Sequence, residues 1–311
     1  MPQSQMRWEH KVAVQKTLSL LPGRMPERAN YLLQRRVTKK LPASEHQFLL
    51  HFDETVRHID DYEAHGRQPV ATIAAYEFGA GWDLIGPLSR WALGVSRQVL
   101  VDIDAHLRFE LVNHSIAALT RLHGTLEERA GRSLRRADAS PVQSLADLQE
   151  RFGIEYRAPC DARNTDLPPS SFDLITSTFT LEHVPRDDIS AILRESARLL
   201  VDGGVVSCSI DMNDHYAFDD SRISVYNFLR YSDRRWRFIN SSLHYQNRLR
   251  ARDYRELFAQ AGLSTVEAVI HTPDAEHRKR LRSLPLAPPF AHAYTLDELE
   301  PSAMRVIATT S

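Results

Sequence analysis

The residues best suited to chemistry lie where a mostly apolar run, 70–75, leads into an acid and two glycines one residue apart. The acid is Glu77, and the glycines are Gly79 and Gly81. Glycine lets the backbone adopt positive φ, and it lets a ligand approach without a Cβ in the way. A helix that begins just beyond such a turn offers unpaired N–H groups. The pattern predicts a strand that runs into a nucleotide-binding turn.

The residues after the turn separate two kinds of nucleotide site. A dinucleotide-binding turn has a third glycine three residues after the second, but position 84 is leucine, and 84–92 has helical spacing. The pattern E-x-G-x-G resembles the first motif of class I S-adenosylmethionine-dependent methyltransferases, although Asp83 stands where that motif usually has its third glycine. The resemblance implies that Glu77, Gly79 and Gly81 bind the cofactor.

A second acidic position follows the apolar run 98–101. In a doubly wound sheet, an acid at the carboxyl end of strand two lies beside the first glycine turn and can accept both hydroxyls of a ribose. Asp102 matches that position because it directly follows the apolar run, and Asp104 is the alternative. Asp104 also suits the N-cap of a helix expected within 105–122. We therefore expect Asp102 to bind the ribose.

A third signal follows the short strand expected at 154–158. The resemblance implies that an acid and a small residue here, Asp161 and Ala162, hold the adenine. An acid beside a free backbone N–H complements the donor and the acceptor on the adenine edge. A loop aspartate is otherwise often just a turn residue, and its place in the series favours the functional interpretation.

The most specific run is 167–185, which resembles the family's fourth-strand block of a turn, Phe-Asp, an apolar strand and then Leu-Glu-His. The resemblance implies that residues near Thr178 emerge beside the methionine arm of the cofactor. His183 has two interpretations: a neutral imidazole that accepts the substrate proton, or a structural brace at the turn between strand and helix. The structural or cofactor-side role is favoured.

The segment 211–247 is irregular, polar and aromatic, with several arginines between its aromatic residues. A long segment at the carboxyl edge of a sheet is a typical place for an acceptor-binding lid. His215 follows the fifth strand closely and is the first candidate for a general base, with His183 second. The arginines could bind an anionic handle on the acceptor, although singly they are also typical of a solvated helical face.

Composition limits the classes of partner and site. The chain has 311 residues and a formal net charge of −1, so its global charge does not favour nucleic acid or an anionic membrane. Only Cys160 and Cys208 are present, so we expect neither a disulfide framework nor a metal site, and a reducing compartment. With no apolar run of membrane-helix length and no leader pattern, the sequence predicts a cytoplasmic protein. It leaves the oligomeric state open.

These signals together predict an α/β fold: a doubly wound, mostly parallel Rossmann-like sheet with an N-terminal helical extension. We expect a helical cap at 1–68, a methyltransferase domain at 69–271 with the lid 211–247, and a C-terminal extension at 272–311, in which 304–308 could add an edge strand. The resemblance implies methyl transfer from S-adenosylmethionine to a small polar metabolite or glycan precursor. The alternatives are an RNA methyltransferase that uses the arginines and aromatics of the lid, and a cofactor-binding protein without catalysis.

Overall fold

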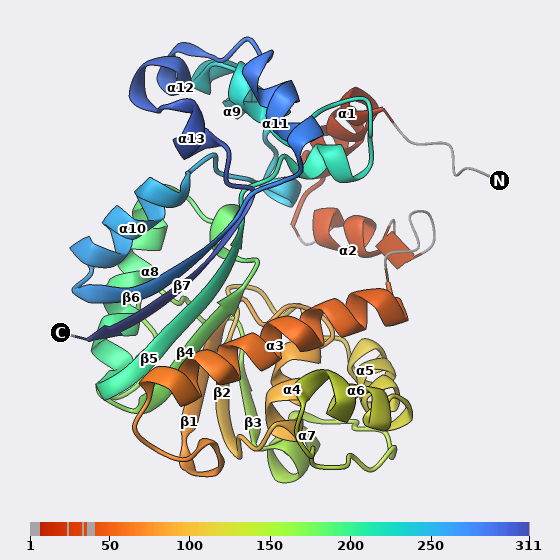
Figure 1. The fold of residues 1–311 in the computed structure, drawn as a ribbon. Coiled ribbons are helices and arrows are strands. Elements are labelled where there is room, and N and C mark those ends of the chain that lie inside the picture. The colour runs from red at the N-terminus through yellow and green to blue at the C-terminus, as the bar shows by residue number, and fades with distance from the viewer. Residues whose placement is uncertain (1–6, 24, 33, 36–40, 311) are drawn as a thin grey trace.

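A seven-stranded sheet forms the centre of the computed structural model, which describes residues 7–23, 25–32, 34–35 and 41–310. The strand order is β3-β2-β1-β4-β5-β7-β6 (Figure 1). Adjacent strands are parallel, except that β7 is antiparallel to both β5 and β6. The predicted doubly wound, mostly parallel sheet is confirmed. The strands are β1 (Ala74–Phe78), β2 (Arg97–Val101), β3 (Ile154–Arg157), β4 (Phe172–Thr178), β5 (Leu200–Asp211), β6 (Leu263–His271) and β7 (Ala303–Thr310).

Helices cover both faces of this sheet, and this explains why its central strands β1, β4 and β5 are largely buried. All five residues of β1 are buried. One face packs on α8 (Arg186–Leu199) and α10 (Ala251–Gln260). The other face packs on α3 (Glu45–His65), α4 (Ile85–Ala92), α5 (Phe109–Arg121) and α7 (Leu145–Phe152), with α6 (His123–Ala130) alongside. None of the described helices combines the length and apolar character that a membrane crossing requires.

A second lobe stands above the carboxyl ends of the strands in Figure 1. We call it the lid lobe; it shares one apolar cluster that includes Val12, Tyr216, Trp236, Leu281 and Phe290. The predicted lid 211–247 is thus one part of a lobe that also takes residues from both ends of the chain. Its helices are α1 (Trp8–Ser19), α9 (Asp233–Ile239), α11 (Ala275–Arg282), α12 (Pro288–Ala293) and α13 (Leu296–Leu299), while α2 (Met25–Leu32) lies between the two lobes.

The N-terminal helices α1 and α3 pack in different parts of the molecule. α1 belongs to the lid lobe, whereas α3 lies directly on the sheet and contributes the buried Phe52 and Ile59. α3 begins at a capping box, in which the Ser44 side chain accepts the Gln47 N–H and the Gln47 side chain accepts the Ser44 N–H. The apolar spacing of 48–59 thus corresponds to a helix that completes the core of the sheet.

The sequence expectation about the last strand is wrong. The C-terminal strand is not at an edge, because β7 pairs with β5 on one side and with β6 on the other. An antiparallel strand can be inserted there because the chain returns from the lid lobe above the sheet. The glycines Gly203 and Gly204 lie inside a strand, because α8 ends at Leu199 and β5 already begins at Leu200. An irregular register opposite Phe172 and Leu174 absorbs them.

Candidate active site

The glycine turn follows β1 at the point where the strand order reverses, which is where open α/β sheets bind ligands. Gly79 and Gly81 have φ of +77° and +74°, a conformation that L side chains rarely adopt. The Gly79 N–H donates to the Val101 carbonyl at 3.0 Å. A Cβ at Gly79 would clash with the Thr180 side chain, but a Cβ at Gly81 would have no atom within 4 Å. The backbone at Gly81 therefore borders open space.

Asp102 joins the turn to the ends of β2 and β3. Its Oδ2 accepts the Gly81 N–H at 3.2 Å, and its side chain is buried with 7% of the residue exposed. Its backbone carbonyl accepts the Cys160 N–H at 2.8 Å, and its own N–H donates to the Arg157 carbonyl. Burial raises the pKa of Asp102, and the Gly81 N–H partly offsets this. Asp102 thus connects the glycine turn to the loop after β3, both of which were predicted to bind the cofactor.

Glu77 is buried near the end of β1. Its buried carboxylate pairs with the Arg90 guanidinium of α4. Arg90 also donates to Thr176 at 2.8 Å and to Gln98 at 2.9 Å. A buried acid matched by a guanidinium ties α4 to strands β1, β2 and β4 beneath the turn. The structure therefore places Glu77 under the glycines, where it supports the turn.

Asp161 and Ala162 lie in the loop after β3. The Asp161 carboxylate accepts hydrogen bonds from the Arg163 side chain, at 2.7 Å for the shortest, and Arg163 also bonds Asp188 of α8 at 2.6 Å. These bonds from Arg163 lower the pKa of Asp161, which keeps it an acceptor. Ala162 packs at the edge of the sheet core. Asp161 is close to the Asp102 loop through Cys160, although its carboxylate already has a partner.

Thr178 ends β4, and its hydroxyl contacts α3. Thr178 Oγ1 is 3.1 Å from His58 Nε2, while His58 Nδ1 is 2.7 Å from Ser207 Oγ. Burial lowers the pKa of His58 to about 3, so this histidine is neutral. The Ser207 hydroxyl in turn donates to Asp61 at 2.6 Å. The end of β4 is thereby fixed to the helix that covers the sheet.

Three histidines meet beside the ends of β4 and β5. His183 ends the 3-10 turn Leu181–His183, His215 begins the turn His215–Phe218, and His244 ends the turn Ser242–His244. The ring centroids of His183 and His215 are 5.0 Å apart, and that of His244 is 6.0 Å from His215. The structure therefore brings both predicted catalytic residues together. His244, a further group of the predicted lid that could take a proton, joins them, and so does the buried Glu182, which was not predicted from the sequence to be in the site.

The surroundings of His183 and His244 favour their neutral rings. Burial lowers the pKa of His183, and the neighbouring His215 lowers it further. Burial also holds the pKa of His244 well below its ordinary value. Asp211 Oδ2 lies 3.3 Å from His215 Nε2. Glu182 is 1% exposed, and burial raises its pKa well above the ordinary value. Neutral imidazoles keep a lone pair that can take a proton or bind a ligand.

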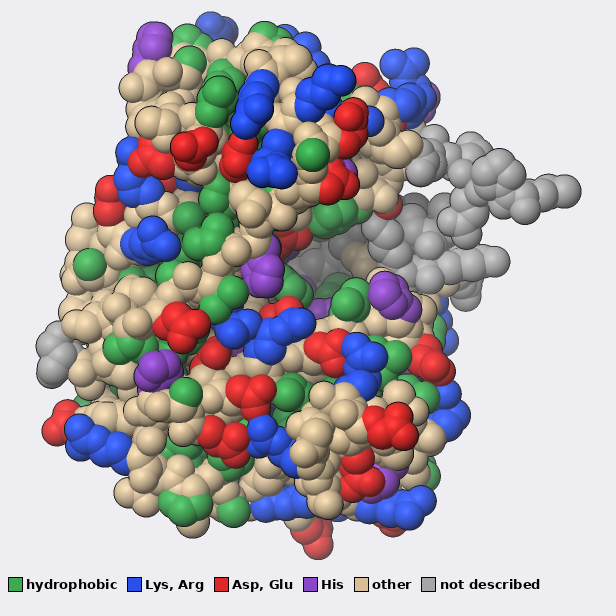
Figure 2. Space-filling view, in the orientation of Figure 1, with side chains coloured by type: hydrophobic (Ala, Val, Ile, Leu, Met, Phe, Trp, Pro, Cys, Tyr) green, Lys and Arg blue, Asp and Glu red, His purple; other side chains and the backbone are tan. Residues whose placement is uncertain are grey.

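The space-filling view shows the surface hollowed where the lid lobe meets the sheet, with histidine and acidic side chains near the opening (Figure 2).

The lid arginines 230, 234, 235 and 237 are exposed, which matches the solvated-face interpretation for each of them. Arg248 and Arg250 are buried and have a structural task. Arg248 donates to the Phe228 carbonyl at 2.9 Å, and Arg250 to the Met212 carbonyl at 2.8 Å.

A stack of rings beside the glycine turn was missed at the sequence level. Trp82 lies between Tyr31 of α2 and His106, with ring centroids 5.1 Å and 5.2 Å apart and nearly parallel planes. Arg108 lies over Tyr31 and Trp82. The only sequence signal was an aromatic residue directly after Gly81. The stack brings α2 onto the glycine turn.

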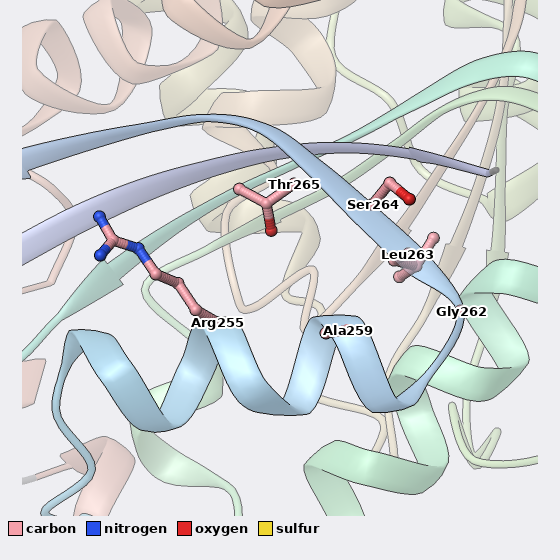
Figure 3. A pocket seen from close by; sticks show the side chains of 6 residues that line it. All are labelled: Arg255, Ala259, Gly262, Leu263, Ser264 and Thr265. Carbon is pink, nitrogen blue, oxygen red and sulfur yellow. The ribbon is translucent and has the colours of Figure 1, made fainter.

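A shallow pocket of about 320 Å³ lies elsewhere, between α10 and the start of β6 (Figure 3). It is lined by residues that include Arg255, Ala259 and Thr265. β6 begins opposite Thr310 and runs parallel to β5, so this pocket is near the amino-terminal end of the sheet. It lacks histidine and acidic side chains and is separate from the candidate site.

Comparison with known proteins identified one family model. The model of a methyltransferase domain matches residues 90–268, more than half of the chain. No curated protein matched the sequence.

The similar solved structures have low sequence identity to this chain. Geranyl diphosphate C-methyltransferase from Streptomyces coelicolor A3(2) is 13% identical with a TM-score of 0.44, over 82% of this chain and 79% of that one. Phosphoethanolamine N-methyltransferase 2 from Haemonchus contortus is 14% identical with a TM-score of 0.45, over 90% of this chain and 59% of that one. A putative methyltransferase in complex with the Haloferax volcanii Trm112 activator is 15% identical with a TM-score of 0.46, over 88% and 95%.

Proposed function

The chain belongs to the methyltransferase domain family, and we propose that it transfers the methyl group of S-adenosylmethionine to a small polar metabolite or glycan precursor. The observation that carries the proposal is the contact between Gly81 and Asp102 at the reversal point of the sheet. It joins an open glycine turn to an acid at the end of the next strand. This is the arrangement that an adenosine-type cofactor requires.

The residues present fit that cofactor. Open space at Gly81 leaves room for a ligand against bare backbone. Asp102 is next to it and is the proposed acceptor of the ribose hydroxyls. Asp161 and Ala162 border the same loops on the proposed adenine side, and Thr178 ends the strand on the proposed methionine side. Glu77 contributes by supporting the turn through Arg90.

The cofactor supplies an activated methyl group on a sulfonium, so the protein mainly has to align the two reactants. His215 and His183 lie beyond the ends of β4 and β5, on the side of the lid. A neutral imidazole there can accept a proton from the acceptor. We propose His215 as the first such group and His183 as the second.

The chemistry of the lid supports a polar or anionic acceptor. Aromatic residues such as Tyr216 and Trp236 form the buried core of the lid lobe, and the exposed arginines 230, 234, 235 and 237 lie on the same segment of the chain. Arginine binds carboxylate and phosphate groups through two parallel hydrogen bonds. These groups occur on many small metabolites and sugar nucleotides. The net charge of −1 gives no general attraction for RNA, so RNA is the second candidate.

The decisive experiment supplies methyl-labelled cofactor and fractionated cell metabolites to the purified protein and identifies the labelled product. A labelled small molecule supports the proposal, and label recovered only in RNA would favour the alternative. Cofactor binding without transfer to any acceptor pool would indicate a protein that binds the cofactor but does not catalyse.

His215→Asn should abolish transfer while calorimetry shows unchanged cofactor affinity. Full activity in this variant would remove His215 from the site.

A further inference from the structure

Glu182, His183 and His215 come close together without satisfying one another. One ligand atom from each residue lies within 4.8 Å of the others. They come from two separate segments, the turn after β4 and the turn after β5. Among the residues that the structure describes, neither carboxylate oxygen of Glu182 makes a hydrogen bond of ordinary geometry, and His215 Nε2 lies 3.3 Å from Asp211 Oδ2 without forming one.

The unpaired Glu182 is the strongest of these observations. A fully buried carboxyl group without a well-formed hydrogen bond is unfavourable in an apolar environment, and more so when it is ionised. A buried polar group that stays unsatisfied in a native protein calls for an explanation, and a bound ion is one of them. The nearby histidine nitrogens make an ion the chemically matched explanation here.

The turn that carries two of these residues is held rigidly by the lid. The Asn247 N–H donates to the Glu182 carbonyl at 2.7 Å, and Asn247 Nδ2 donates to the Leu181 and Val184 carbonyls at 2.8 and 2.9 Å. His183 Nδ1 lies 2.7 Å from the Tyr245 carbonyl, to which it donates, so Nε2 retains its lone pair. A histidine whose other nitrogen donates to a carbonyl is oriented as metal-binding histidines usually are.

We infer that Glu182, His183 and His215 bind one divalent transition-metal ion, with Asp211 close enough to supply a further oxygen. Two imidazoles and one carboxylate suit Fe²⁺, Mn²⁺, Co²⁺ or Zn²⁺. Mg²⁺ prefers sites made of oxygen ligands and water and should bind here more weakly. The prediction of no metal site rested on cysteine spacing alone. Glu182 and His215 are 33 positions apart in the chain, so no short pattern contains both.

The inference deepens the proposed function and rests on it for its role in the reaction. An acceptor hydroxyl bound to the ion would lose its proton to water more readily, because the cation stabilises the resulting oxyanion. That oxygen would then form a bond to the methyl carbon while the carbon–sulfur bond breaks and S-adenosylhomocysteine leaves. Histidine nitrogens bound to the ion cannot accept the proton themselves, so the ion would replace them as the activating group.

The test uses the full chain after treatment with a chelator, without cofactor or acceptor. Calorimetric titration with Mn²⁺, Co²⁺ and Zn²⁺ should show one site per chain, and Co²⁺ should give visible absorption bands typical of nitrogen and oxygen ligands. His215→Asn and Glu182→Gln should each weaken binding by about tenfold or more. His277→Asn is the matched control, since His277 pairs with Asp274 on the surface of α11.

Two results would overturn the inference: the absence of a stoichiometric site for all three ions, or unchanged ion affinity in both ligand variants. Circular dichroism separates misfolding from ligand loss for the buried Glu182→Gln, and the less buried His215→Asn gives an independent reading. Binding of S-adenosylmethionine to the metal-free protein is measured separately. Cofactor binding without ion binding defeats only the metal site, whereas ion binding without cofactor binding defeats only the proposed methyl transfer.

Discussion

At the scale of single residues, the site depends on the open space beside Gly81 and on the hydrogen bond that Asp102 accepts from the Gly81 N–H. Gly79 and Gly81 share a left-handed backbone but have different surroundings, since only Gly79 faces a side chain, that of Thr180. Asp102 binds the turn through the Gly81 N–H. The two positions therefore give separable predictions about cofactor binding.

Gly81→Val should abolish S-adenosylmethionine binding in calorimetry while the far-UV spectrum stays that of the native protein. The branched side chain would project into the open space beside the turn, and the left-handed backbone adds a strain of about 1–2 kcal/mol. Gly131→Val is the matched control, because Gly131 has φ +63°, also faces open space, and follows α6. Unchanged cofactor affinity in Gly81→Val would exclude the turn from the binding site.

Asp102→Ala should weaken cofactor binding by about 1.5–3 kcal/mol, the range for hydrogen bonds to a charged group. Asp104→Ala should have a smaller effect, because Asp104 follows the strand end and no hydrogen bond links it to the glycine turn among the described residues. Calorimetry on both variants gives the comparison. A larger loss in Asp104→Ala would show that the ribose position had been assigned to the wrong acid.

At the scale of elements, α8 is tied to the loop that leads into β4. Glu195 of α8 accepts hydrogen bonds from the Thr165 N–H at 2.9 Å and from the Thr165 hydroxyl at 2.6 Å. Arg198 donates to the same carboxylate at 2.7 Å and to the Leu167 carbonyl at 2.8 Å. The loop after Asp161 is therefore held by one acid and one guanidinium.

Glu195→Gln should reduce the free energy of unfolding by about 1–3 kcal/mol near neutral pH. The hydrogen bond from Arg198, followed by those from Thr165, lowers the pKa of Glu195 to about 2. As the pH falls, Glu195 takes up its proton at a higher pH in the unfolded state than in the folded state. The stabilisation is therefore complete above the ordinary glutamate pKa and is lost as the pH falls toward about 2.

Urea unfolding of wild type and Glu195→Gln at about pH 7 and about pH 3 measures this difference, which should shrink at the lower pH. Glu276→Gln is the control, since Glu276 is exposed and pairs only with Arg280 across one turn of α11. A difference that stays constant with pH would mean that the charge of Glu195 does not stabilise the fold.

At the scale of the whole molecule, the lid lobe is assembled from three distant parts of the chain. The Trp8 N–H donates to Asp220 at 3.0 Å, and the Trp8 ring lies 5.9 Å from Tyr216 and 6.0 Å from Tyr231. The first described helix thus packs on the segment that carries His215. We therefore expect the proposed acceptor side of the site to depend on this packing more than the glycine turn does.

Trp8→Ala should therefore increase protease cleavage within residues 216–245 and lower turnover, with cofactor affinity unchanged. Loss of the ring removes packing from the lobe and leaves part of its apolar cluster exposed. Limited proteolysis and calorimetry measure the two effects. Leu20→Ala is the control because Leu20 is 84% exposed. Equal loss of cofactor affinity would show that the two lobes cannot be separated functionally.

The sequence by itself determined the glycine turn, the acid after β2, the order of the first five strands and the Leu-Glu-His turn. Each depends on local chemistry: glycine at positive φ, apolar runs that form buried strands, and acids at strand ends. Such features lie within a few residues of one another, so a short pattern contains the information that specifies them.

Only the tertiary structure decided where the partners of these residues are. Glu77 is paired by Arg90 of the next helix, and β7 lies between β5 and β6. His183 and His215, 32 positions apart in number, meet beside the buried Glu182. Side chains meet across such separations only when strands pair and helices pack, and no local pattern in the chain specifies those contacts.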